Sequence, residues 1–236
     1  PEIDFGNYVT VNQGILARLS SDFSWLKYGS ANPLSDKGEV HISKWTGSSQ
    51  KWESTVYNEG EQTACYGKYG WFYIGDEKGT KADIVTPYMN GIQADSLLMV
   101  SFKAVAYTSE SGAKDLAKLR VEVVGGGVIQ DFAEEGRTSI DLDLQNFSVE
   151  DPKTVSTTMW DNEISAYNIF LIATEKSPFT GNTRIRFVTP DGEGKPNRVA
   201  MDAIYVRKYV INEEVQDEDM FAANGGSGKD RITVKK

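Results

Sequence analysis

The chain has very few of the residues on which thiol and histidine chemistry depend. Its 236 residues contain one cysteine, Cys65, and one histidine, His41. A single cysteine excludes an intrachain disulfide and a cysteine-rich zinc site. A Ser-His-Asp or Cys-His arrangement would have to use His41, and its surroundings, HISKWTG, are strand-like and contain no nucleophile elbow. We interpret His41 as a surface or structural residue.

Long apolar runs and basic stripes are also missing. No apolar stretch approaches the roughly 18 residues that a membrane-spanning helix needs, so we expect no transmembrane segment. Acidic residues outnumber basic ones by 34 to 25, which gives a formal net charge of −9. An acidic chain without a Lys/Arg stripe is not expected to bind nucleic acid. The chain begins with Pro1, and we expect an export segment or a lipid-anchor cysteine outside it.

The chain contains several short segments in which apolar residues alternate with polar ones. Such alternation is typical of half-buried β-strands, and it occurs at 97–107, 118–124, 139–144 and 183–189. Residues 167–174 are apolar on both faces, and the aromatic, glycine-rich segment 66–75 also suits a strand. Turn clusters separate these segments. The pattern predicts one all-β domain, an antiparallel β-sandwich or barrel, over residues 15–211.

The remaining segments are less regular. Residues 1–14 are expected to form an N-terminal arm or edge strand, and 29–64 long loops around short strands. Residues 212–236 form a C-terminal tail that is first acidic and then rich in Gly and Ser. This tail is expected to be a flexible linker or a strand that returns to an edge.

The segment 197–210, NRVAMDAIYVRKYV, predicts a late strand with one anomalous residue. Alternation places Ile204 and Val206 on one face and puts Asp202 on that same, apolar face. A carboxylate that points toward a core costs several kcal/mol unless it is paired, hydrogen-bonded or bound to a metal. Asp202 therefore needs a structural or a functional explanation.

The order of these segments resembles the galactose-binding-like jelly-roll modules of surface lipoproteins from gut bacteria. The matching stretches are DFSWL, YGKYGWFYIG with DIVTPYMNGI, SLLMVSFKAVAY, LAKLRVEVVGGGVI, AYNIFLIATEKSPFTGNTRIRFVTP and NRVAMDAIYV, within residues 20–210. The resemblance implies a jelly-roll sandwich. Many such modules bind carbohydrate, a number bind a structural calcium ion, and others bind protein. Where the family usually has LDDI in its last strand, this chain has MDAI, with Asp202 kept and Ala203 in place of the second acid.

The resemblance suggests one metal site. The first and last strands of this fold lie close together, so Asp22 and Asp202 could hold calcium together with backbone carbonyls. In the alternative, Asp202 accepts hydrogen bonds from loop amides or from Arg198, and Asp22 caps a turn. We favour this alternative, because Ala203 replaces the second acid, and expect no cofactor beyond that candidate calcium.

Loop aromatics are the candidate ligand-binding residues. The apolar faces of sugar rings stack on exposed Trp and Tyr, while polar side chains bind the hydroxyls. The loop-rich segments contain the following candidates: Trp45, Trp52, Tyr57, Trp160 and Asn162. The alternative is that these rings cover the ends of the core beneath long loops.

Catalysis has the weakest support. A glycosidase needs two acids that face each other across a cleft, and the pair Asp141 and Asp143 alternates onto a solvated strand face. We therefore predict a non-catalytic carbohydrate-binding module, not an enzyme, in an exported protein at the cell surface or the periplasm-facing outer membrane. The alternative is a structural or protein-interaction sandwich without a sugar ligand, and a carbohydrate-active enzyme is the third choice.

Overall fold

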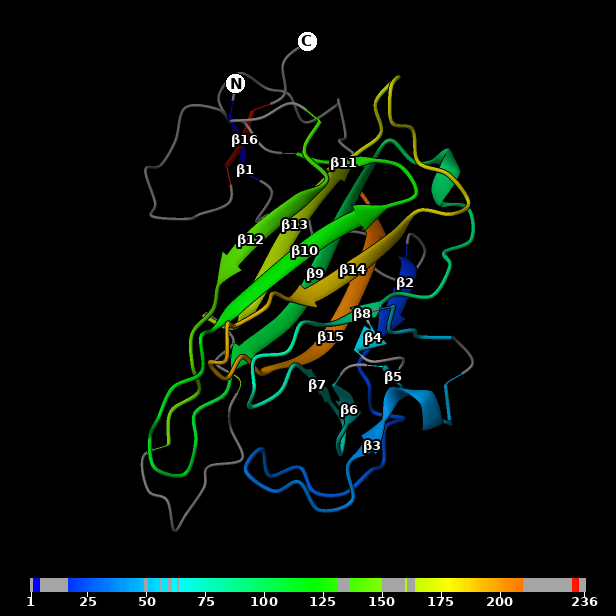
Figure 1. The fold of residues 1–236 in the computed structure, drawn as a ribbon. Helices are drawn as coiled ribbons and strands as arrows, with labels where there is room; N and C mark the ends of the chain where they lie inside the picture. The colour runs from blue at the N-terminus through cyan, green and yellow to red at the C-terminus, as the bar shows by residue number, and fades with distance from the viewer. Residues whose placement is uncertain are drawn as a thin grey trace.

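The protein is an antiparallel β-sandwich of two facing sheets (Figure 1). The computed structural model describes residues 2–4, 17–48, 51–55, 57–58, 61–62, 64–130, 136–149, 160, 164–209 and 231–233. Within these ranges every pair of named strands is antiparallel. The predicted jelly-roll sandwich is confirmed.

The smaller sheet has the strand order β12-β10-β14-β8. Its strands are β8 (Ala82–Val85), β10 (Lys118–Val124), β12 (Ser139–Asp143) and β14 (Arg184–Thr189). In β10 the buried residues alternate with more exposed ones, as the sequence predicts. This alternation turns Leu119, Val121 and Val123 toward the larger sheet.

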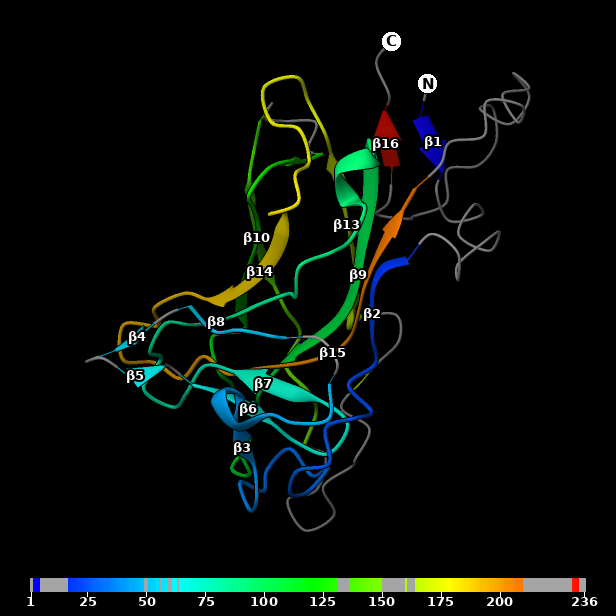
Figure 2. The same cartoon turned by 90° about the vertical axis from the view of Figure 1, so that its right-hand side faces the viewer.

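The larger sheet has the order β11-β13-β9-β15-β7-β6-β3, and β2 pairs with β15 beside this path. Its strands are β2 (Ala17–Ser21), β3 (Val40–His41), β6 (Cys65–Gly67), β7 (Phe72–Ile74), β9 (Leu97–Ala106), β11 (Val128–Ile129), β13 (Ala166–Ile172) and β15 (Val199–Lys208). Figure 2 shows β9 and β15 on one side of the sandwich and β10 and β14 on the other.

The main hydrophobic core fills the space between the sheets. Phe102 of β9 meets Phe187 of β14 across it, with ring centroids 5.0 Å apart. Both side chains are at most 2% exposed. Burying an aromatic ring of this size stabilises the fold by roughly 2–3 kcal/mol.

Strand β15 explains the anomalous position of Asp202. A β-bulge interrupts its pairing with β9 between Asp202 and Tyr205, and Ala203 has a φ of 53°. The extra residue reverses the alternation, so that Met201 before the bulge and Ile204 after it both reach the core. Asp202 is thereby half-buried and does not lie on the core face. The prediction that it shares a face with Ile204 is wrong, because simple alternation takes no account of a bulge.

The segment 66–75 also differs from its prediction. It forms most of a β6–β7 hairpin, in which Tyr66 pairs with Tyr73, and not one strand. Gly70 supplies the turn with a φ of 85°, which an L side chain adopts only with strain. The Lys68 amide donates to the Trp71 carbonyl at 2.8 Å and closes the turn.

Short elements complete the described chain. They are the strands β1 (Glu2–Asp4), β4 (Tyr57–Asn58), β5 (Glu61–Gln62) and β16 (Arg231–Thr233), and the 3₁₀ helices Ile42–Lys44 and Ile92–Ala94. β1 pairs with β16, and β4 with β5. Within the part of the chain that the structure describes, no helix is long and apolar enough to cross a membrane.

The bulge leads to a stability prediction. Replacing Ala203 with Gly removes the steric cost of a positive φ, so we expect the free energy of unfolding to rise by about 1 kcal/mol. The matched control is Ala200→Gly in the same strand, where φ is not positive and the side chain is fully buried. The control should lose about 1–2 kcal/mol. Denaturant titration measures both, and a destabilised Ala203→Gly variant would contradict the assignment of strain to the bulge.

Candidate functional site

A row of aromatic rings crosses the outer face of the larger sheet, on the side away from the main core. Tyr66 stacks on Tyr73 with centroids 5.5 Å apart, and Tyr73 lies 5.5 Å from Tyr107. At the two ends, His41 meets Tyr66 at 5.4 Å and Phe147 meets Tyr107 at 5.4 Å. The row therefore runs from β3 across β6 and β7 to the end of β9.

Strand alternation produces this row. In β7, Phe72 and Ile74 are buried in the core, which leaves Tyr73 on the outer face. Ala200 of β15 pairs with Tyr73 on one side and with Val105 of β9 on the other. Because the Ala200 side chain is a methyl group, rings from the neighbouring strands can meet above it.

A cavity of about 210 Å³ lies on this face beside Tyr73 and Tyr107. We call it the outer-face pocket. It is lined by Pro33, Leu34, Asp36, Glu39, Lys68, Tyr73, Glu77, Tyr107, Ser109, Glu110 and Arg198. These residues come from the loop before β3, the hairpin turn, the ends of β7 and β9 and the start of β15.

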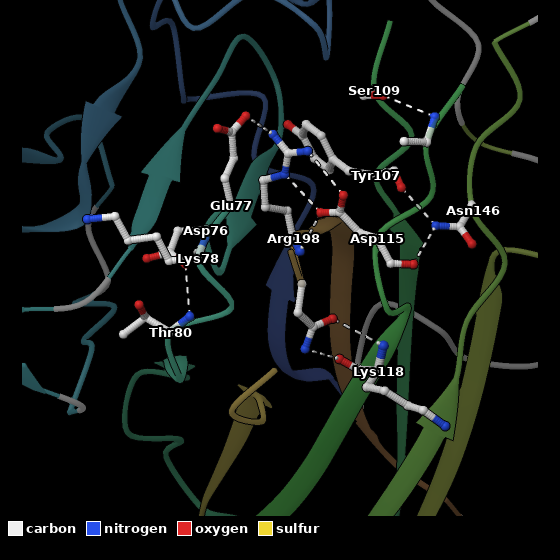
Figure 3. A network of polar contacts seen from close by, with 12 residues as sticks. Asp76, Glu77, Lys78, Thr80, Tyr107, Ser109, Asp115, Lys118, Asn146 and Arg198 are labelled. Atoms are coloured by element: carbon white, nitrogen blue, oxygen red, sulfur yellow. Dashed lines mark hydrogen bonds and ion pairs between the residues drawn. The ribbon is translucent and has the colours of Figure 1, made fainter. Parts of the chain in front are cut away.

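Arg198 is the most extensively paired of these side chains (Figure 3). Its guanidinium donates to both carboxylate oxygens of Asp115, at 2.8 and 3.1 Å, and to Glu77 at 2.9 Å. The same guanidinium lies over the Tyr107 ring, 4.9 Å from its centroid. The Tyr107 amide donates to the Arg198 carbonyl at 3.0 Å, which fixes the two residues side by side.

Backbone contacts fix the turns that carry these groups. The Asp76 carboxylate accepts hydrogen bonds from the amides of Lys78 and Thr80, at 2.9 and 2.8 Å. They hold the turn that positions Glu77 (Figure 3). The Asn146 amide group donates to the carbonyls of Tyr107 and Asp115 at 2.7 and 3.2 Å, which ties the two ends of the loop after β9 together.

A second group of polar contacts surrounds Glu39. Its carboxylate accepts a 2.8 Å hydrogen bond from the Tyr73 hydroxyl and lies 3.7 Å from the Lys68 ammonium. Lys68 also donates to the Ser35 carbonyl. Burial lowers the pKa of Lys68, and Glu39 offsets part of that effect. Burial and the bond to Glu39 raise the pKa of Tyr73, so this hydroxyl stays protonated.

Tyr107 differs from its neighbours because its hydroxyl is buried without a partner. The side chain is 4% exposed, and no hydrogen bond reaches its oxygen from the described residues. Burial raises the pKa of this phenol well above its usual value. The group is therefore a neutral hydroxyl, able both to donate and to accept, on a residue that lines the pocket.

The three candidate tryptophans lie in two different places. Trp52 is a core residue, 7% exposed, with its ring 5.0 Å from Phe23. Trp45 is half-buried against the same core and donates to the Val40 carbonyl at 2.8 Å. Trp160 packs on the outer-face cluster, edge-on to Trp71 at 6.4 Å. Only Trp160 of the three therefore lies in the cluster that contains Tyr73 and Tyr107.

Asn162 lies outside the described residues, and so does the side chain of Tyr57, whose backbone forms part of β4. The function of these two residues stays a prediction.

Asp22 and Asp202 lie near one another, because Ser21 pairs with Ile204 just beyond the bulge. The Asp22 carboxylate accepts from the amide and hydroxyl of Ser24 at 3.0 and 2.8 Å. The Asp202 carboxylate accepts from the Ala203 amide at 2.6 Å. Among the described residues, no group of three or more His, Cys, Asp or Glu side chains could hold a metal ion. A calcium ion here would need backbone carbonyls, and its presence stays a prediction.

Reasoning from the sequence missed the outer-face pocket. Its acids and cations lie on loops that are far apart in the chain, from Asp36 to Arg198, and no local pattern joins them. A partial signal existed in the tyrosines, since Tyr66, Tyr73 and Tyr107 lie in or beside predicted strands. Large amphipathic rings on the polar face of a strand indicate either a covered surface or a binding surface.

Comparisons with known proteins find similarity in structure only. No protein-family model matches the chain, and no curated protein does. A cyclase from Fischerella sp. TAU is 13% identical with a TM-score of 0.47, over 82% of this chain and 99% of that one. The family 11 carbohydrate-binding module of cellulase Lic26A-Cel5E from Clostridium thermocellum is 12% identical with a TM-score of 0.38, over 76% and 99%. The K1 adhesin domain of Lys-gingipain from Porphyromonas gingivalis W83 is 10% identical with a TM-score of 0.36, over 77% and 97%. Carbohydrate-binding modules, which the sequence resemblance predicts, are among the structures found.

The same comparison corrects one expectation. The chain was predicted not to be an enzyme, and this is contradicted by the cyclases among the structures of similar fold. A fold does not determine the chemistry of the sites that it carries. The lack of a histidine-based motif and of an evident pair of facing acids was therefore too little reason to exclude catalysis.

Asp202 generates a pH prediction. Burial raises its pKa from 3.8 to about 6, against the lowering effect of the Ala203 amide and Lys103. The folded state thus holds this proton more tightly than the unfolded state, and stability falls as the pH rises from about 4 to 6. Asp202→Asn keeps an acceptor for the Ala203 amide and cannot ionise. We expect this variant to melt at a higher temperature than wild type above pH 6 and at the same temperature at pH 4.

Thermal melts at pH 4, 5, 6 and 8 measure this difference. The exposed Glu175, as Glu175→Gln, controls for the loss of one negative charge. A difference between Asp202→Asn and wild type that is the same at pH 4 and pH 8 would show that ionisation of Asp202 is not responsible.

Proposed function

We propose that this domain binds carbohydrate in the outer-face pocket. The observation that carries the proposal is that Tyr107, which lines the pocket, has a buried hydroxyl without a hydrogen-bond partner among the described residues. An unsatisfied buried hydroxyl costs about 1–3 kcal/mol. A ligand oxygen within reach of Tyr107 would remove that cost, so the pocket favours a ligand rich in hydroxyl groups.

The rest of the lining supports the same ligand class. A sugar offers many hydroxyl donors, and the pocket offers carboxylate acceptors in Asp36, Glu39, Glu77 and Glu110. Tyr73, Pro33 and Leu34 add apolar surface, which the C–H face of a sugar ring can contact. The pairing of Arg198 with Asp115 and Glu77 holds the polar groups in fixed positions before a ligand arrives.

Trp160 belongs to this proposal as a second contact. It packs on the same outer-face cluster as the pocket tyrosines and is partly exposed. A glycan longer than one ring could extend from the pocket toward Trp160 and stack on it. Trp45 and Trp52 pack against the main core and stay secondary candidates.

We also propose that the domain acts outside the cell, at a surface where polysaccharide is within reach. The support for this is the resemblance of its strands to those of modules in surface lipoproteins. Fractionation of the native host cells, followed by protease treatment of intact cells, measures the location. Protein recovered in the cytosol and protected from protease would contradict it.

Tyr107→Phe tests the site directly. The substitution removes only the unpaired hydroxyl, so we expect the melting temperature to stay the same or to rise. Affinity for a bound glycan should fall about tenfold, which corresponds to the loss of one hydrogen bond. Affinity gels with a panel of polysaccharides identify a ligand, and calorimetry compares the variants. Release of reducing sugar, assayed in the same samples, measures whether the protein also cleaves the glycan.

Two variants serve as controls. Tyr73→Phe breaks the 2.8 Å bond to Glu39 and should lower the melting temperature, unlike Tyr107→Phe. Tyr69→Ala removes a ring that is 50% exposed and does not line the pocket, and it should leave binding unchanged. If wild type binds none of the polysaccharides, or if Tyr107→Phe binds as tightly as wild type, the proposal fails.

A further inference from the structure

The charges around the outer-face pocket are unequal. Its lining contains the carboxylates of Asp36, Glu39, Glu77 and Glu110 but only two cations, Lys68 and Arg198. Asp115, behind Arg198, adds a further buried carboxylate that is within 3.1 Å of the guanidinium. The pocket therefore has an excess of negative charge, in a chain whose formal net charge is −9.

Both cations are already engaged. The Lys68 ammonium is buried, donates to the Ser35 carbonyl and faces Glu39 at 3.7 Å. The Arg198 guanidinium makes two hydrogen bonds to Asp115 and one to Glu77. An anionic ligand would have to compete with these carboxylates, so the cations do not form a site for a uronic acid or a sulfated sugar.

Two of the acids, in contrast, remain available. Asp36 and Glu110 are exposed at the rim, and among the described residues neither carboxylate has a hydrogen bond or an ion pair. Such acids are ordinary on a surface by themselves. Here they border a cavity that is also lined by Tyr107, whose buried hydroxyl has no partner among the described residues.

We propose that the outer-face pocket prefers a sugar with a free, protonated amino group. This rests on the proposed carbohydrate binding and specifies its ligand class. The ammonium group lies between the rim carboxylates of Asp36 and Glu110, and a ring oxygen or hydroxyl of the same sugar meets the Tyr107 hydroxyl. An ammonium group offers three donors and a full positive charge to these two carboxylates, which have no hydrogen bond or ion pair among the described residues.

The size of the pocket sets how much of a glycan it takes. Its volume of about 210 Å³ is below the roughly 300–1,000 Å³ of pockets that enclose drug-sized ligands. The pocket therefore accommodates one sugar ring, at the end of a chain or on a branch.

The experiment compares three β-1,4-linked oligomers that differ only at carbon 2. They are oligomers of glucosamine, N-acetylglucosamine and glucose, and calorimetry at low and high salt measures the affinity of each for the whole chain. We expect the glucosamine oligomer to bind at least tenfold more tightly than the other two at low salt. That preference should shrink as salt rises, because screening weakens interactions between exposed charges.

The matched variants separate local from general charge. Asp36→Asn/Glu110→Gln removes the two rim charges and should abolish the preference for glucosamine. Glu175→Gln/Glu193→Gln removes two exposed charges that do not line the pocket and should keep the preference. If both double variants lose it equally, the preference reflects net charge alone and the inference is overturned.

The remaining outcomes distinguish this inference from the proposed function. Equal binding of all three oligomers, weakened by Tyr107→Phe, would overturn the amino-sugar preference and leave carbohydrate binding in place. If neutral or acidic polysaccharides bind and the glucosamine oligomer does not, the amino-sugar preference is likewise overturned and carbohydrate binding is left in place. Failure of every glycan to bind would overturn both.

Discussion

The sandwich depends on one irregularity in β15, which is one of its two ten-residue central strands. Along one edge β15 pairs with β9 both before and after the bulge, whereas along its other edge it pairs with two strands in succession. Val199–Met201 pair with β7, and Ile204–Arg207 pair with β2. The bulge between Asp202 and Tyr205 lies where one partner gives way to the other, and it adds the residue that lets the strand change direction. The positive φ of Ala203 is the local cost of this arrangement, and the bond from the Ala203 amide to Asp202 offsets part of it.

The bulge also links the core to the pocket. Before it, β15 turns Met201 to the core, so that Ala200 faces outward beneath the tyrosine row. After it, Ile204 and Val206 face the core. If β15 had no bulge and Ile204 and Val206 still faced the core, simple alternation would turn Met201 outward. Ala200 and Arg198 would then face the core. The position of Arg198 over Tyr107, and with it the order of the pocket's polar groups, therefore rests on one inserted residue.

The sequence predicted those parts of the fold in which the polarity of each residue indicates whether its side chain is buried. Alternation placed Leu119, Val121 and Val123 correctly, because burial of every second side chain is a local property of a regular strand. It failed at Asp202 and at the 66–75 hairpin, where a single residue with a positive φ changes the direction of the chain. Nothing in composition indicates which alanine will adopt that conformation. The pocket could not be predicted from the sequence for another reason. Its acids, cations and tyrosines come together only through long-range strand pairing.

The contrast between tryptophans and tyrosines shows why the site lies where it does. Trp52 is buried in the core, and the indole N–H of Trp45 donates to a backbone carbonyl, so each side chain stabilises the fold. The pocket tyrosines include one whose polar group stabilises nothing within the described protein. A phenylalanine at Tyr107 would fill the same space without an unsatisfied hydroxyl, so packing does not explain the oxygen. This buried polar atom, on a residue that also lines a cavity with fixed charges, is the observation on which the proposed ligand site rests.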